Sequence, residues 1–449
     1  MYIVLLFLLV TSSLYSDECD SIDHAIVSVF AIRNDTGDVV MSQNCDLSMV
    51  PSSCMKVATT GAALHLLGAD ARFETHLEYD GAIDEAKTLH GNVYIRGGGD
   101  PCLASERIHG RDACDKQIAV WADAIQKIGI QKIEGSITPD SSKWEKALAS
   151  PSWLWEDIGN YYGAGASALS FHENQYSIFF KPGKKVGDMA AILRTEPPLS
   201  SLILHSEVTT GKEGSGDCAC IYGVEFSSSQ YIRGTIPLGV DEFAIKGAIA
   251  DPAAYCAKLL AVELSKRGIK LENKKIGGSL KRTCLHIAYS PMVKDIVYWT
   301  NQSSVNLYAE HILKKMGEVV YKEGSLVSGI KAITDFWRLQ GVKLSGFHMA
   351  DGSGLSRKNL VTARQFVDIL LKMKQSPFFS IFLESLPKKE GSVRAKSGFM
   401  TFNKGCVGYT EDAVFAIIIN NCTNQQAMND KINDLLSEIQ KLTKFPLRI

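Results

Sequence analysis

The stretch "MVPSSCMKVATTGAALHLLG", residues 49–68, places two adjacent serines in front of a lysine. Ser53 stands three residues before Lys56, and positions i and i+3 share one face of a helix. A serine hydroxyl becomes an effective nucleophile when a neighbouring base takes its proton, and a desolvated lysine can be that base. The spacing therefore selects Ser53 over Ser52. Spacing alone is not specific, because two later serine–lysine pairs, 328/331 and 385/388, share it.

The same stretch has the end signals of a helix, with serine at its start and glycine at its close. Small side chains on most of its faces predict that this helix is buried. Cys54 follows Ser53 directly, and one helical step turns its side chain about 100° away. We therefore expect Cys54 to be a core residue and not a reactive thiol.

Composition describes a globular protein and argues against two classes of partner. The 449 residues are enough for two or three domains, with 45% hydrophobic and 22% charged residues. Lys+Arg number 48 and Asp+Glu 49, which gives a net charge of −1. This balance offers no electrostatic attraction to nucleic acid or to an anionic membrane.

The first twenty residues, "MYIVLLFLLVTSSLYSDECD", combine an apolar run with small polar residues, which is typical of a secretory signal. The run is shorter than the ~20 residues that cross a bilayer. We therefore expect a signal peptide over residues 1–16, with cleavage near Ser16. The mature protein would be periplasmic or otherwise exported, without a stable membrane anchor.

Eleven cysteines fit an oxidising compartment, so structural disulfides are expected, and the odd count leaves at least one thiol unpaired. The sequence holds no CxxC pair, and "CAC" at 218–220 lacks the second pair that a structural zinc site needs. Its ten histidines include no HExxH. We expect neither a metal nor an organic cofactor.

The order of the predicted elements indicates an α+β protein with an insertion. Residues 25–41 alternate like two strands around a turn, a predicted hairpin. From about 75 to 280, short alternating strands dominate, with helices predicted at 111–129 and 251–268 and an exposed loop at 209–220. After about 285, helices return, followed by three strands and a helix over 425–442. The two ends could form one domain that the strand-rich middle interrupts.

Three short motifs appear in a particular order: S-C-M-K at 53–56, S-V-N at 304–306 and K-S-G at 396–398. An S-x-x-K, an S-x-N and a K-[ST]-G in this order are the signature of penicillin-recognising acyl transferases. Each triplet alone is common. All three together, in this order and sequence context, are more specific than any one of them.

The first two motifs predict a nucleophile and its proton carriers. Ser53 at a helix start would lie near unpaired backbone N–H groups. Lys56, buried beside another cation, could stay neutral near pH 7 and accept the hydroxyl proton. Ser304 would relay protons toward a leaving amine. Asn306 would hydrogen-bond a peptide amide or Lys56.

The third motif predicts the substrate-binding strand. Lys396 would supply a positive charge and Ser397 a hydroxyl, a combination suited to a terminal carboxylate. Gly398 would let the backbone approach closely. The N–H groups of Ser53 and Phe399 would form an oxyanion hole.

On these motifs the chain resembles the class C low-molecular-mass penicillin-binding proteins, the D-alanyl-D-alanine carboxypeptidase/endopeptidase family of bacterial cell-wall enzymes. The resemblance covers nearly the whole mature chain. It also rests on "GNVYIRGGGDP" (91–101), "YYGAGASALSFHEN" (161–174), "GAIADPAAYCAKLL" (247–260) and "DGSGLSRKN" (351–359). It implies a serine β-lactamase-like penicillin-binding domain of antiparallel sheet and helices, residues 17–75 and 281–449. Two smaller, strand-rich domains within residues 76–280 would interrupt it.

The chain departs from the family pattern at two positions. Val305 stands where the family usually has aspartate, and Ser397 stands where threonine is usual. Serine keeps the hydroxyl, so the change at Ser397 is mild. The loss of a polar side chain at Val305 bears on rate and substrate preference more than on reaction type.

Structural readings compete with the functional ones. Ser304 and Asn306 also suit helix capping, and Lys396 could be a solvated strand charge. The serines and aspartate of "DGSGLSR", residues 351–357, could line a cleft or form a turn with Asx-type hydrogen bonds. The aromatic residues at 153, 155, 161 and 162 favour packing over ligand contact.

The resemblance implies an exported serine DD-peptidase that acts on peptidoglycan stem peptides and is acylated by β-lactams. Its substrate would be the terminal D-Ala-D-Ala bond, a D-alanyl cross-link, or both. Two alternatives stay open. One is a serine β-lactamase on the same scaffold, and the other is a non-catalytic penicillin-binding wall sensor.

Overall fold

The computed structural model describes residues 22–279 and 281–444. The predicted signal peptide, residues 1–16, lies outside the described residues. Both ends of the described chain build one five-stranded antiparallel sheet in the order β17-β18-β19-β1-β2. Its strands are β1 (Ile26–Arg33), β2 (Val39–Gln43), β17 (Arg394–Met400), β18 (Asn403–Tyr409) and β19 (Ala413–Asn420). The predicted α+β class is confirmed, and so are the hairpin and the three late strands.

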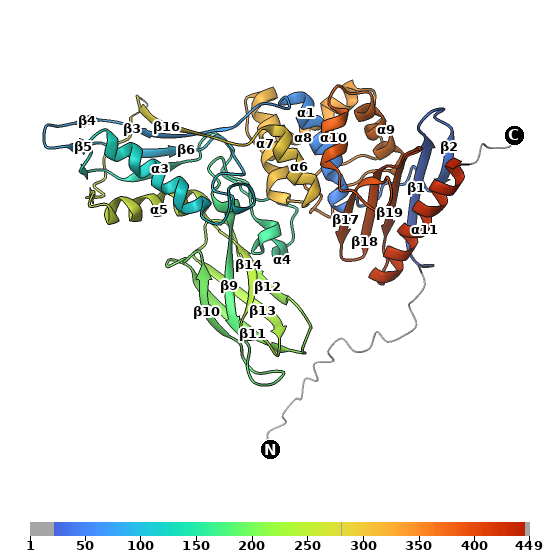
Figure 1. Ribbon diagram of the computed structural model, residues 1–449, viewed down its shortest axis with the longest axis horizontal. Helices are drawn as coiled ribbons and strands as arrows, with labels where there is room; N and C mark the ends of the chain where they lie inside the picture. Colours follow the sequence, from blue (N-terminus) through green and yellow to red (C-terminus); the bar gives the residue numbers. More distant parts are fainter. Residues whose placement is uncertain (1–21, 280, 445–449) are drawn as a thin grey trace, which may run out of the picture.

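Helices cover both faces of this sheet (Figure 1). Successive side chains of a strand point to opposite faces, and here both faces carry apolar side chains that must be buried. Val29 and neighbours at even spacing join the core under α11. Phe30 and Ile32 point the other way, into the core under the remaining helices. The helices are α1 (Lys56–Leu66), α6 (Val293–Gln302), α7 (Asn306–Tyr321), α8 (Leu326–Leu339), α9 (Ala363–Lys374), α10 (Phe379–Ser385) and α11 (Gln425–Lys444).

The middle of the chain forms smaller sheets away from the five-stranded one (Figure 1). Two four-stranded sheets, β16-β3-β6-β8 and β15-β7-β5-β4, pack with α3 and α5. Two three-stranded sheets, β10-β9-β14 and β11-β13-β12, form the arm at the bottom of the view. The strands are β3 (Glu74–Tyr79), β4 (Ala82–Ile83), β5 (Thr88–His90), β6 (Val93–Arg96), β7 (Lys132–Ile133), β8 (Ile137–Asp140), β9 (Gln175–Lys181), β10 (Ala191–Glu196), β11 (Ile203–Gly211), β12 (Cys218–Tyr222), β13 (Ser229–Pro237), β14 (Phe243–Ala248), β15 (Lys270–Leu271) and β16 (Thr283–Tyr289).

The helices of this middle region are α2 (Glu106–His109), α3 (Ala113–Lys127), α4 (Trp155–Ile158) and α5 (Pro252–Lys266). Two of them, α3 and α5, lie where the sequence predicts them. The exposed loop predicted at 209–220 is shorter than expected, because β11 and β12 take its two ends. The residue ranges proposed for the domains stay a prediction, and the boundary at 280 cuts through one sheet, since β16 pairs with β3.

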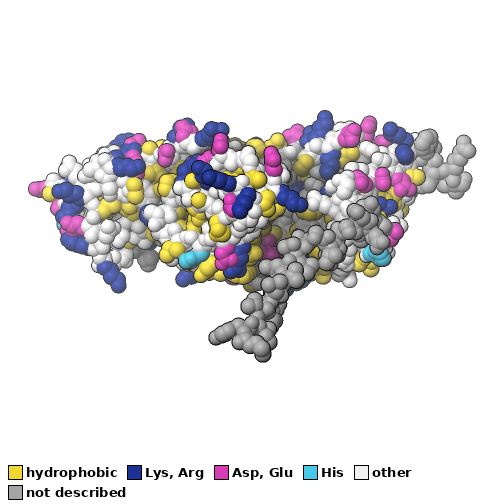
Figure 2. All heavy atoms as spheres, turned by 90° about the horizontal axis from the view of Figure 1, so that it is seen from below, with side chains coloured by type: hydrophobic (Ala, Val, Ile, Leu, Met, Phe, Trp, Pro, Cys, Tyr) yellow, Lys and Arg dark blue, Asp and Glu magenta, His cyan; other side chains and the backbone are white. Residues whose placement is uncertain are grey.

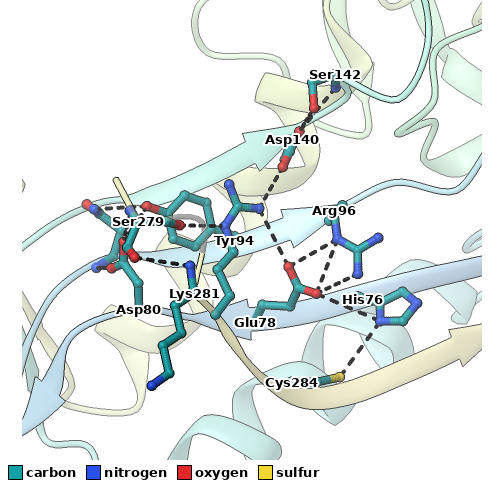
Figure 3. A network of polar contacts seen from close by, with 12 residues as sticks. His76, Glu78, Asp80, Tyr94, Arg96, Asp140, Ser142, Ser279, Lys281 and Cys284 are labelled. Carbon is teal, nitrogen blue, oxygen red and sulfur yellow. Dashed lines mark hydrogen bonds and ion pairs between the residues drawn. The ribbon is translucent and has the colours of Figure 1, made fainter. Parts of the chain in front are cut away.

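A network of charged and polar side chains ties β16 and its approach to that sheet (Figure 3). The Arg96 guanidinium lies 2.6 Å from a Glu78 carboxylate oxygen, and Arg282 reaches Asp140 at the same distance. Glu78 is largely buried, and the hydrogen bonds from Arg96 hold the pKa of that carboxyl below its usual value against the opposing effect of burial. The network holds β16, the strand through which the chain returns to the helices that cover the five-stranded sheet.

The expected disulfides are absent from the described part of the chain, where the cysteines from Cys45 to Cys422 are all unpaired. Cys54 is buried, as predicted, and burial raises the pKa of its thiol to about 12. On the face seen in Figure 2, basic and acidic side chains are interspersed. Across residues 22–279 and 281–444, none of the helices combines the length and apolar character that a bilayer crossing requires.

Candidate active site

Ser53 lies in a single 3-10 turn, η1 (Ser52–Met55), which leads directly into α1. The predicted helix start is therefore a tighter turn. Ser52 takes a left-handed backbone conformation, φ 50°, and is fully buried. Ser53 instead lines a cavity of about 610 Å³. Of the two serines, the structure exposes to that cavity the one that the spacing selects.

Lys56 is buried with its amine against the Ser53 hydroxyl, at 3.0 Å from Nζ to Oγ. The amine also donates to Asn306 Oδ1 and to the Ser353 carbonyl, each at 2.6 Å. Burial, and then the nearby charge of Lys396, hold the pKa of Lys56 well below its ordinary value. A lowered pKa favours the deprotonated amine, the form that can accept the Ser53 proton.

The second motif lies between α6 and α7 and faces the same cavity. Ser304 has a left-handed backbone, φ 55°, and lines the cavity with Val305 and Asn306. Asn306 opens α7 and accepts the Lys56 hydrogen bond through Oδ1. Its Nδ2 donates to the Tyr162 carbonyl at 2.8 Å. The first two motifs thus meet at Lys56, while Ser304 stands at the cavity wall.

The third motif lies on β17, the edge strand beside η1. A Cβ added to Gly398 would lie 2.8 Å from the Ser53 nitrogen and 2.7 Å from the Pro51 oxygen, so only glycine lets β17 pass this close. Phe399 lines the cavity. The strand is therefore placed where one of its backbone N–H groups and the Ser53 N–H could both donate hydrogen bonds to the same oxyanion.

Lys396 and Ser397 stand back from the cavity that Phe399 lines. Lys396 is almost fully buried, and its Nζ donates to the Ser397 carbonyl at 2.7 Å. Burial lowers the pKa of Lys396 to about 8. In this arrangement Lys396 acts on Lys56 through its charge. Direct contact of Lys396 or Ser397 with a carboxylate stays a prediction.

The loop "DGSGLSR" is a buried turn built on one carboxylate. Asp351 accepts hydrogen bonds from the Gly354 and Ser356 N–H groups, from Asn359 Nδ2 and from Trp153 Nε1. This is the structural alternative that the sequence left open. The turn nevertheless serves the site, because it aims the Ser353 carbonyl at Lys56.

Glu310 is a buried residue of the site that the sequence did not single out. It is buried on α7 and accepts from the Ser353 and Gly352 N–H groups at 2.7 and 3.2 Å. Burial and the nearby Asp351 raise the pKa of Glu310 to about 7. Its spacing from Asn306, four residues and one helical turn, was the available signal.

The far wall of the cavity comes from the middle of the chain. Its lining residues include Arg107, Glu156, Asp157, Tyr161, Tyr162, Glu173, Lys246, Cys220 and Tyr222. Tyr161 and Tyr162, predicted to pack in the core or between domains, are not core residues, because both line the cavity and are exposed by 51% and 37%; packing between domains stays a prediction. The prediction holds for Trp153, which is buried.

The arrangement suits acyl transfer: a hydroxyl, an amine of lowered pKa in contact with it, and backbone N–H groups where an oxyanion would form. Within the part of the chain that the structure describes, His, Cys, Asp and Glu side chains nowhere gather in groups of three that could hold a metal ion.

A five-stranded antiparallel sheet with helices on both faces, and a serine against a buried lysine at its edge, define the penicillin-binding, serine β-lactamase-like class of enzymes. Within this class, the chain belongs to the D-Ala-D-Ala carboxypeptidase 3 (S13) family, which it matches over residues 12–441. This is a family of serine peptidases, so the resemblance drawn from the motifs and the enzyme class are confirmed.

Individual relatives are distant but cover most of the chain. A D-alanyl-D-alanine carboxypeptidase of Actinomadura sp. (strain R39) is 25% identical over 90% of this chain and 79% of its own length. The D-alanyl-D-alanine carboxypeptidase DacB of Haemophilus influenzae is 22% identical, over 84% and 77%. The crystal structure of penicillin-binding protein 4 from H. influenzae superposes with a TM-score of 0.77 at 21% identity, covering 92% of this chain and 97% of that one. This likeness shows the fold.

Proposed function

We propose that this protein is an exported serine DD-peptidase that cleaves the terminal D-Ala-D-Ala bond of peptidoglycan stem peptides, D-alanyl cross-links, or both. The observation that carries the proposal is the 3.0 Å contact between the Lys56 amine and the Ser53 hydroxyl inside a buried site. Family membership supports the substrate class. The signal-like sequence at residues 1–16 supports export, to the periplasm or beyond.

In the proposed reaction, Ser53 Oγ attacks the carbonyl carbon between two D-alanines while Lys56 takes the hydroxyl proton. The oxyanion forms against the Ser53 and Phe399 N–H groups. The C–N bond then breaks, and Lys56 returns the proton through Ser304 to the departing amine. Water hydrolyses the resulting ester, with Lys56 again as the base, and this step restores the Ser53 hydroxyl.

The same site would react with β-lactams, which present a strained amide beside a carboxylate. One solved structure of H. influenzae penicillin-binding protein 4 is a complex with a β-lactam. That complex supports β-lactam acylation of Ser53 here. Lys396 would contribute the positive charge that attracts the carboxylate of either ligand.

The test is a pair of adjacent serine variants. Ser53→Ala should lose both D-alanine release from a stem pentapeptide and covalent labelling by a fluorescent penicillin. Ser52→Ala is the matched control, since its hydroxyl is buried and has no hydrogen-bond partner. It should keep both activities. Release of D-alanine by Ser53→Ala would overturn the mechanism.

The same assay separates the alternatives. Rapid turnover of the penicillin without D-alanine release would indicate a β-lactamase. A stable penicillin adduct without D-alanine release in the unmodified protein would indicate a wall sensor. A cross-linked dimer of stem peptides, offered beside the pentapeptide, distinguishes endopeptidase from carboxypeptidase activity.

A further inference from the structure

Exposed aromatic side chains collect at the rim of the Ser53 cavity, around α4 and β12. Trp155 is 56% exposed, and its ring lies 4.8 Å from that of Tyr222, centroid to centroid. Tyr222 and Tyr161 both line the cavity that contains Ser53. We call Trp155, Tyr222 and Tyr161 the aromatic ledge. Large apolar groups left exposed beside a cleft are a recognised mark of a binding surface.

Hydrogen bonds of one buried side chain hold the ledge residues in place. Asn160, buried between α4 and β12, donates to the Glu156 carbonyl at 2.6 Å and to the Ile221 carbonyl at 3.2 Å. Its Oδ1 accepts from the Ile221 N–H at 3.1 Å. Asn160 therefore locks the segment that carries Trp155 and Tyr161 to the strand that carries Tyr222. A ligand would meet rings that are already in position, and little ordering entropy would be lost on binding.

The ledge is also polar at its edges. Glu156 lines the cavity next to Trp155, and the Arg233 guanidinium lies over the Tyr222 ring, 5.9 Å from its centre. The exposed Trp155 ring, with a carboxylate and a guanidinium close by, matches a ligand with one C–H face and many hydroxyl groups. A pyranose ring has this character, because its axial C–H groups are drawn to the negative face of an aromatic ring.

We propose that the aromatic ledge binds the sugar rings of the glycan strand whose stem peptide occupies the Ser53 cavity. This inference rests on the proposed function, since that function makes the substrate a peptide joined to a sugar polymer. About four residues separate the scissile bond from the sugar, an extended length of roughly 13 Å. The sugar must therefore lie outside the nucleophile's own pocket, and the rim formed by Tyr161 and Tyr222 is continuous with that pocket.

The experiment compares two substrates that share one stem: the free pentapeptide and the same pentapeptide carrying its disaccharide. The kcat/KM for the disaccharide-bearing pentapeptide, divided by that for the free pentapeptide, measures the contribution of the sugar. Trp155→Ala should reduce this ratio about fivefold, the effect of losing one ring contact, and Trp155→Phe should restore most of it. Tyr289→Ala, which removes an equally exposed ring (56%) on β16, should leave the ratio unchanged. An unchanged ratio in Trp155→Ala would overturn the proposal.

A binding measurement separates this proposal from the proposed function. Ser53→Ala protein is titrated with a tetramer of N-acetylglucosamine, which has no peptide, and affinity is read by calorimetry. Binding that disappears in the Ser53→Ala/Trp155→Ala double variant supports the ledge even if the unmodified protein releases no D-alanine. If the unmodified protein releases D-alanine but the tetramer binds equally well with and without Trp155, the proposal for the aromatic ledge is wrong and the proposed peptidase function stands.

Discussion

Asn306 joins the nucleophile's base to the inserted part of the chain through Tyr162. The amide nitrogen of Asn306 donates to the Tyr162 carbonyl, and its oxygen accepts from the Lys56 amine. Because a carbonyl can only accept, Tyr162 fixes the orientation of the amide, and the oxygen must face Lys56. The middle region of the chain thus takes part in setting the polarity around the Lys56 amine.

Replacing Asn306 with aspartate should move the acidic limb of the pH profile upward. A carboxylate 2.6 Å from Nζ, in place of a neutral oxygen, would favour the ammonium form of Lys56. We expect the pH at which penicillin acylation reaches half its maximal rate to rise by about 1 unit or more. Acylation rates measured from pH 5 to 10 check this. Asn306→Ala, which adds no charge, should slow acylation without raising that pH. Superimposable profiles for the two variants would contradict the prediction.

The unmodified enzyme should have a bell-shaped pH dependence. Protonated Lys56 has no lone pair, so kcat/KM rises with pH as Lys56 loses its proton, well below its ordinary pKa near 10.5. Lys396, with a pKa of about 8, loses its positive charge as the pH rises further. Attraction of the substrate carboxylate then weakens, so kcat/KM falls above about pH 8. A stem peptide with an esterified terminal carboxylate should lack this alkaline limb. An identical alkaline limb for both substrates would show that Lys396 does not act on the carboxylate.

Val305→Asp should stabilise the protein. Val305 is the N-cap residue of α7, and no side-chain hydrogen bond caps this helix. An aspartate can accept from the free N–H groups of the first turn, which contributes about 1 kcal/mol. We expect the thermal-unfolding midpoint to rise by about 1 °C. Val305→Ala should lower it, because alanine caps poorly and loses packing. A midpoint below that of the unmodified protein in Val305→Asp would mean that Val305 packing outweighs the cap.

Gly398→Ala should abolish acylation. The added Cβ would press on the Ser53 and Cys54 nitrogens at 2.8 and 2.9 Å, which forces β17 away from the nucleophile's turn. Gly277→Ala is the control, since a Cβ there meets nothing within 4 Å and its backbone is not in the left-handed region. Penicillin labelling and thermal melting of both variants check this. Normal labelling by Gly398→Ala would show that the gap between β17 and η1 can widen without cost.

The sequence predicted what local pattern and motif order encode. The apolar runs of β1 and β19 and the end signals of α1 are local patterns, so those elements form where expected. The meeting of Ser53, Lys56 and Asn306 followed from the motifs. Lys396 also comes near Lys56, but it is covered by its own strand, and a motif does not specify burial.

The remaining features depend on contacts between distant segments. The 3-10 turn at Ser53 accompanies the close approach of Gly354, where an added Cβ would lie 1.9 Å from the Ser52 oxygen. Tyr161 lines the cavity only because the inserted region docks beside α7. No periodicity within residues 161–174 encodes that docking. The disulfide expectation failed for a similar reason, since cysteine number says nothing about which thiols meet.

In the sheet that places β17 beside Ser53, strand β1 from the start of the chain pairs with β19 from its later part. A ribosome makes Ser53 early and β17–β19 more than 300 residues later, so a nascent chain carries the Ser53 hydroxyl for most of its synthesis without the strand that would complete an oxyanion hole. On the proposed mechanism, acylating power can arise only after β17 has been made and lies beside η1, and a truncated product lacking β17–β19 would be inert toward its substrate.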